Sequence, residues 1–149
     1  MTAAPPDLPP DPQRVAADPA RSAFVSANAG SGKTKTLIDR VARLLLVGAE
    51  PEKILCVTYT KAAAAEMQRR LFERLGGWCV ADTNELRRDL ADLEGRAQAT
   101  YDDEGLARAR RLFARALETP GGLKIQTIHA FCEAVLHQFP LEANIAAHF

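Results

Sequence analysis

Residues 24–37, "FVSANAGSGKTKTL", run from a short apolar segment through a glycine-bearing loop into a stretch with helical spacing. The loop closes on Gly-Lys-Thr at residues 32–34, which is how the phosphate-binding pattern G-x-x-x-x-G-K-[ST] ends. Ala27 stands where that pattern has its first glycine. Because the match lies between a predicted strand and a predicted helix, it indicates a nucleotide site.

Each residue type in the loop suits the binding of phosphate. Backbone N–H groups of such a turn, together with the N-terminus of the next helix, form a concave anion site. Gly30 and Gly32 let the main chain curl around phosphate oxygens, Lys33 reaches the β- and γ-phosphates, and Thr34 offers its hydroxyl to Mg²⁺. The alternative is a glycine-rich turn with a solvated lysine. The predicted nucleotide-binding residues of the loop are Ala27, Asn28, Ala29, Gly30, Ser31, Gly32, Lys33, Thr34 and Lys35.

The composition is that of a globular chain. Its 149 residues are 47% hydrophobic and 26% charged, with nineteen cationic and nineteen anionic side chains, which argues against a polybasic tail. Three widely spaced cysteines fit reduced thiols in a cytoplasmic protein better than a disulfide framework or a zinc site. We expect no secretory signal and no membrane span, since the longest apolar stretch, residues 44–47, is far too short.

Strands and helices are predicted to alternate, which indicates an α/β fold with a parallel sheet and crossover helices. Residues 1–12 hold five prolines and are expected to form a disordered lead-in. The predicted strands are 24–26, 54–58 (buried on both faces) and 123–127. The predicted helices are 13–21 (interrupted near Pro19), 32–48, 62–75 (closed by Gly76-Gly77), 82–93, from about 102, and 128–139. Three strands are few for such a sheet, so we expect the chain to be a piece of something longer.

Two further motifs follow predicted strands: "VTYTKAAAAEM" at 57–67 and "TIHAFC" at 127–132. Ligands of open α/β sheets bind at the carboxyl ends of the strands. Thr58 and Thr60 are therefore candidates for phosphate contacts, and Tyr59 for stacking on a base. Each residue alone also has a simpler explanation: the threonines as strand and capping residues, and His129 as a hydrogen-bonded structural residue.

In the order "SANAGSGKT", "VTYTKAAAAEM", "TIHAFC", the motifs resemble those of superfamily 1 DNA helicases of the UvrD/RecB type. Their loop has alanine at its first position, which accounts for Ala27. Residues 112–143 look closest to the AddA family of bacterial helicase–nuclease subunits. The resemblance covers roughly residues 13–149 and implies a P-loop NTPase (RecA-like) domain, with a helical insertion at about 76–119.

The resemblance also implies an activity and site roles. The parent would be an ATP-dependent helicase with exonuclease activity that uses ATP and Mg²⁺, acts on DNA ends in recombinational double-strand-break repair, and pairs with an AddB-like subunit. Lys33 would be the catalytic lysine, Thr34 the Mg²⁺ ligand and Gln13 the adenine contact. The residues matching single-stranded-DNA contacts are Thr58, Tyr59, Thr60, Lys61, Thr127, His129 and Phe131. Relatives commonly have asparagine before the lysine of the second motif. Its absence here favours a phosphate contact for Lys61.

Phosphoryl transfer needs an acidic strand end for Mg²⁺ and an arginine finger. No run of four apolar residues followed by Asp-Glu occurs in the sequence, so we expect this fragment to bind nucleotide without turnover. One alternative is a complete small P-loop kinase-type enzyme using Asp102, Asp103 or Glu104 as its acid. Another is a non-catalytic helical interaction module with a vestigial loop.

Overall fold

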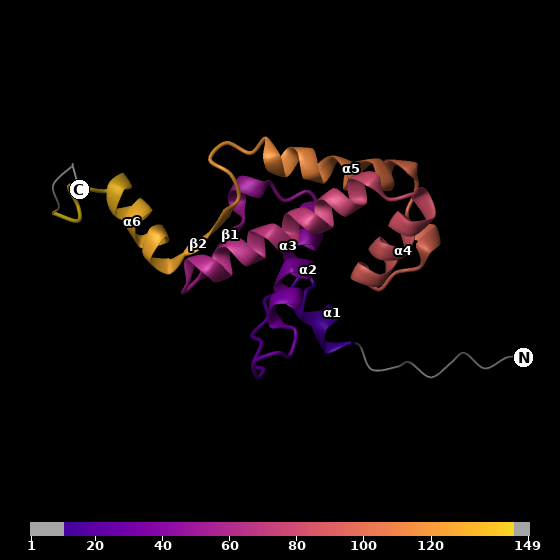
Figure 1. Cartoon of the computed structure of the whole chain (residues 1–149), viewed down its shortest axis with the longest axis horizontal. Helices are drawn as coiled ribbons and strands as arrows, with labels where there is room; N and C mark the ends of the chain where they lie inside the picture. Colours follow the sequence, from indigo (N-terminus) through magenta and orange to yellow (C-terminus); the bar gives the residue numbers. More distant parts are fainter. Residues whose placement is uncertain (1–10, 145–149) are drawn as a thin grey trace, which may run out of the picture.

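Helices dominate the computed structural model, which describes residues 11–144 (Figure 1). The elements in chain order are α1 Pro12–Ala16, α2 Lys33–Leu46, η1 Pro51–Lys53, β1 Leu55–Thr58, α3 Lys61–Val80, α4 Thr83–Glu94, η2 Gln98–Thr100, α5 Asp103–Leu117, β2 Lys124–Thr127 and α6 Ile128–Gln138. Most of the predicted lead-in lies outside the described residues. Its last residue, Pro12, is helical, because Asp11 caps α1 by accepting a hydrogen bond from the Gln13 N–H.

The sheet has two parallel strands, β1 and β2, with the register Leu55↔Lys124 to Thr58↔Thr127. Both strands were predicted, and the helical segment between them supplies the crossover. Because the strands are parallel, their carboxyl ends meet at Thr58 and Thr127. The second and third sequence motifs therefore come together at one edge of the fold.

The predicted strand at residues 24–26 is wrong: this segment has no regular secondary structure. A strand needs a neighbour for its backbone hydrogen bonds, and in the described part of the chain no strand lies beside it. Phe24 is consequently 96% exposed. The prediction that 54–58 is buried on both faces is also wrong, since Leu55 and Val57 are about half exposed while only Cys56 is buried.

Helix α3 runs through Gly76-Gly77, where the sequence predicted its end, and continues to Val80. Glycine in a helix costs roughly 1 kcal/mol relative to alanine, so packing must offset that cost. Leu75 and Trp78 on this last segment are buried, and Gly76 lies against the ring of Phe113. The same ring meets Phe72 edge-on, with centroids 6.1 Å apart. Burial against α5 thus extends α3 past its glycines.

The hydrophobic core lies mainly between α2, α3, α4 and α5. Its largest fully buried side chains are Leu45, Leu71, Leu75, Leu86 and Leu90. The predicted helices at 82–93 and from about 102 are confirmed, and their caps explain their starts: Asp82 accepts from Glu85 N–H at 2.9 Å and Asp102 from Gly105 N–H at 2.8 Å. Within the described residues, α6 buries no side chain.

Two arginines of α2 attach the N-terminal segment to this core. The Arg40 guanidinium donates to the carbonyls of Ala16, Asp18 and Arg21 at 3.0, 2.7 and 2.6 Å. Arg43 donates to the carbonyl of Arg14 at 2.9 Å. A five-residue helix has little stability of its own, so these bonds fix α1 beside α2. The short helix expected over 13–21 accordingly ends at Ala16, before Pro19.

Candidate nucleotide site

The loop at residues 27–34 curls through two left-handed glycines. Gly30 has φ +79° and Gly32 has φ +84°, a backbone region that side chains other than glycine rarely adopt. Ser31 Oγ and N–H both donate to the carbonyl of Asn28, which tightens the turn. The Gly32 carbonyl then accepts from Thr36 N–H at 2.9 Å and Thr36 Oγ1 at 3.0 Å and begins α2.

Lys33 extends back over the loop, and its Nζ donates a hydrogen bond to the carbonyl of Ala27. Lys33 and Thr34 occupy the first turn of α2, and both are exposed. The N–H groups of a helix N-terminus attract anions. The structure thus brings together one cation, one hydroxyl and the helix N-terminus, as a phosphate site requires.

Gln13 lies against this loop although it comes nineteen positions before Gly32. A Cβ added at Gly32 would lie 3.1 Å from Gln13 Nε2. The arginine bonds from α2 to the Arg14 and Ala16 carbonyls hold the helix that carries Gln13. Neither Arg40 nor Arg43 belongs to a motif that the sequence makes visible. Their spacing of three on α2 puts them on one side of the helix, but their backbone partners have no sequence signature.

Cavities flank the loop on two sides. One of about 610 Å³ is lined by Gln13, Ala27, Ser31 and Lys33 together with the apolar Phe24 and Val25. A smaller one, of about 290 Å³, is lined by Gly30, Gly32, Lys33, Thr34, Lys35 and, from α3, Arg70. Apart from Asn28 and Ala29, every residue predicted for nucleotide binding lines one of these two cavities.

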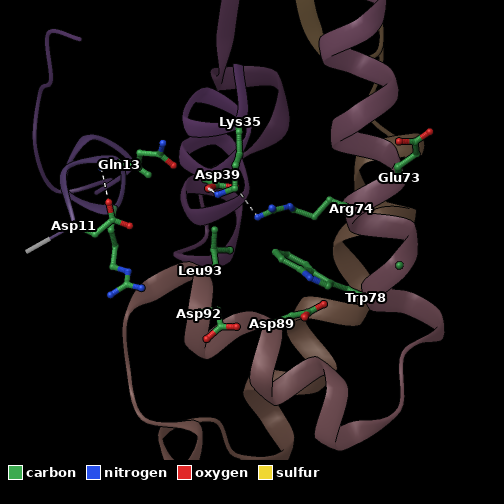
Figure 2. A pocket seen from close by; sticks show the side chains of 13 residues that line it. Asp11, Gln13, Lys35, Asp39, Glu73, Arg74, Trp78, Asp89, Asp92 and Leu93 are labelled. Carbon is green, nitrogen blue, oxygen red and sulfur yellow. Dashed lines mark hydrogen bonds and ion pairs between the residues drawn. The ribbon is translucent and has the colours of Figure 1, made fainter. Parts of the chain in front are cut away.

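A third cavity lies where α1, α2, α3 and α4 meet (Figure 2). Gln13 lines it from α1, Lys35 and Asp39 from α2, and Arg74 from α3. The largely buried Asp39 is 2.7 Å from Lys35 Nζ and 2.8 Å from Arg74 Nη1. The second contact is close but poorly aligned, so it is an ion pair rather than a good hydrogen bond. It fixes α3 beside α2.

The predicted DNA-contacting residues form a separate group at the β1–β2 edge, away from the loop that lies below α2 in Figure 1. Tyr59 is 84% exposed, so it is not a core residue. Lys61 and His129 are exposed and Phe131 is half-buried. Thr60 and Thr127 each cap a helix, accepting from the N–H of Ala63 and Ala130. Capping, the simpler explanation, therefore accounts for these two threonines.

Mg²⁺ is bound in nucleotide sites by one or two protein groups plus substrate phosphates and water. The exposed Thr34 hydroxyl fits that demand as a single protein ligand. No group of three or more His, Cys, Asp or Glu side chains suited to a metal occurs among residues 11–144. Over the same described residues, no helix is both long and apolar enough to cross a membrane.

Comparison with known proteins gives a family match over residues 8–149, to the "UvrD/REP helicase N-terminal domain". Relatives named as the AddA subunit of an "ATP-dependent helicase/nuclease" include that of Ligilactobacillus salivarius, 31% identical over 140 residues, covering 94% of this chain and 10% of the relative. That of Enterococcus faecalis is 34% identical over 116 residues, 78% of this chain and 7% of the relative. The chain thus spans a tenth or less of these relatives. No solved structure matches it.

Proposed function

Because the chain belongs to the UvrD/REP helicase N-terminal domain family, we propose that it is the ATP-binding part of an ATP-dependent DNA helicase/nuclease subunit. Its parent acts in double-strand-break repair by recombination, on DNA ends and beside an AddB-like partner. Residues 13–149 are the N-terminal part of the RecA-like domain, and about 76–119 are a helical insertion in it. The relatives' names, which describe an ATP-dependent helicase/nuclease, support the activity.

The observation that carries this proposal is the approach of Gln13 to the phosphate loop. A glutamine amide presents one donor and one acceptor side by side, as the edge of adenine does. Its Nε2 lies close to Gly32, between the glycine-rich turn and the exposed flank of α1. A glycine-rich turn with only a solvated lysine has no need of such a neighbour. The pairing favours a nucleotide bound by base and phosphates together.

Lys33 neutralises the β- and γ-phosphates after leaving the Ala27 carbonyl, which it contacts in the structure. Backbone N–H groups at 30–34 surround the phosphates, and the Thr34 hydroxyl joins the coordination of Mg²⁺. Mg²⁺ supplies charge neutralisation of the triphosphate when bound. Since the sequence holds no acidic strand end of the required type, the 149-residue chain binds nucleotide without turning it over.

Tyr59, at the carboxyl end of β1, is proposed to stack on bases of single-stranded DNA. Its exposed ring follows Thr58, which pairs with Thr127 across the sheet. Lys61 begins α3 and is exposed beside it. Thr58, Thr60, Thr127, His129 and Phe131 complete the proposed surface. Neither the kinase-type enzyme nor the helical module is favoured by a specific observation.

The test is a thermal melt with and without Mg-ATP. Ligand at about a hundred times its dissociation constant stabilises a fold by roughly 2.7 kcal/mol. Lys33→Ala is expected to remove most of that gain. Lys53→Ala is the matched control, because Lys53 is also exposed but pairs with Glu50 away from the loop. If millimolar ATP leaves the wild-type melting temperature unchanged, the proposal fails.

A further inference from the structure

Arg70 of α3 faces the phosphate loop from a different element. Among the described residues, it is the one lining the 290 Å³ cavity that does not come from the loop or the first turn of α2. The other charged side chains around this cavity are Lys33 and Lys35, and no carboxylate of residues 11–144 lines it. Two glycines and the α2 N-terminus add backbone N–H groups. Such a lining suits a polyanion.

The position of Arg70 is fixed by the next turn of each helix. Arg74, four residues after Arg70 on α3, pairs with Asp39, four residues after Lys35 on α2. Residues four apart lie one above the other on a helix. The Arg74–Asp39 ion pair therefore places Arg70 and Lys35 opposite each other at the loop, as Figure 2 indicates for the lower pair.

In the structure Arg70 is paired on its own helix. Its Nε donates to Glu66 Oε1 at 2.6 Å, while Arg69 donates to the same carboxylate at 3.0 and 2.8 Å and also to Glu73. These bonds, first those of Arg69 and then that of Arg70, lower the pKa of the Glu66 carboxyl to about 2. Glu66 therefore keeps a cationic partner when Arg70 leaves. The Arg70 side chain is 47% exposed and has room to turn.

We infer that Arg70 is a further nucleotide-binding residue, which exchanges Glu66 for the phosphates of ATP bound at the loop. This inference rests on the proposed function and adds a cation from α3 to those of Lys33 and Lys35. Arginine suits the role because its planar fork binds phosphate oxygens in pairs. Helix α3 begins at Thr60 and Lys61, so the contact joins the nucleotide to the helix that starts in the second motif.

The experiment measures binding of ATP and of inorganic tripolyphosphate to the 149-residue chain by calorimetry, with Mg²⁺ present. Arg70→Met is expected to weaken both ligands by about 5–10-fold, the lower range for a hydrogen bond between charged groups that are partly exposed. Arg69→Met is the matched control, since Arg69 shares Glu66 but does not line the cavity. It should stay within about twofold of wild type. Arg70→Lys should recover part of the loss.

The outcomes separate the two proposals. If wild type binds ATP and Arg70→Met binds both ligands as tightly as Arg69→Met, this inference is overturned and the proposed function stands. A loss for ATP without a loss for tripolyphosphate also overturns it, because Arg70 would then contact base or ribose. If wild type binds neither ligand, both proposals fail. Circular dichroism of each variant checks the fold, and Arg70→Lys keeps the test decisive if Arg70→Met unfolds.

Discussion

Replacing Gly32 by alanine tests the proposed adenine contact, and Gly30 offers a control with the same backbone geometry. Both glycines have φ near +80°, so alanine at either position meets the same left-handed strain of about 1–2 kcal/mol. Only at Gly32 does the new Cβ meet a neighbour, Gln13 Nε2 at 3.1 Å. At Gly30 nothing lies within 4 Å.

The extra effect of Gly32→Ala is expected in selectivity rather than in stability. Gln13 can yield a few tenths of an ångström at little cost, because the contact is with the far end of a flexible side chain. That movement displaces the amide from the position proposed for the base. A neutral hydrogen bond contributes about 0.5–1.5 kcal/mol, so the preference for ATP over GTP should fall by about 2–12-fold.

The assay is a fluorescence titration with ATP and GTP, alongside urea unfolding, for Gly30→Ala, Gly32→Ala and each in a Gln13→Ala background. Both alanines should lower affinity and stability similarly, but only Gly32→Ala should reduce the ATP/GTP ratio. In the Gln13→Ala background that difference should vanish, as for any pair coupled through direct contact. An unchanged ratio in Gly32→Ala would refute the proposed use of Gln13.

Tyr59→Ala should weaken single-stranded DNA binding by about 1–3 kcal/mol, measured by fluorescence anisotropy, with the melting temperature nearly unchanged; loss of the fold would contradict the exposed position of the ring. Leu75→Ala should cost about 2–5 kcal/mol in urea unfolding because Leu75 is fully buried, whereas the exposed Val80→Ala should cost less than about 0.5 kcal/mol. Glu66 has its pKa lowered from 4.5 to about 2 by Arg69 and Arg70, so its stabilisation is complete above pH 4.5 and lost as pH falls through about 2. Unfolding free energies of wild type and Glu66→Gln should converge over that window, and a constant difference would argue against the pairing.

The sequence predicted the elements whose signals are local. Asp82 and Asp102 cap their helices through their own side chains, and the PGG turn precedes β2 as expected. It failed where a distant residue decides. Nothing near Gly76 indicates that Phe113 will pack on it and extend α3. An apolar run such as 24–26 cannot by itself report whether a partner strand lies beside it.

The candidate site divides in the same way. The spacing from Ala27 to Thr34 predicts a phosphate loop because its chemistry is contiguous. The contribution of Arg70 is invisible in sequence, since it depends on the ion pair between Arg74 and Asp39 on another helix. For Gln13, the resemblance suggested a role, but only the tertiary fold gives its distance from Gly32.

The three carbonyls bound by Arg40 have a consequence for the order of folding. Five residues of helix are too few to persist alone, so α1 forms only on an α2 that already presents Arg40 and Arg43. The Gln13 amide therefore reaches its position after the helix behind the phosphate loop has formed. A newly made chain would acquire its affinity for phosphate first and its discrimination between bases second.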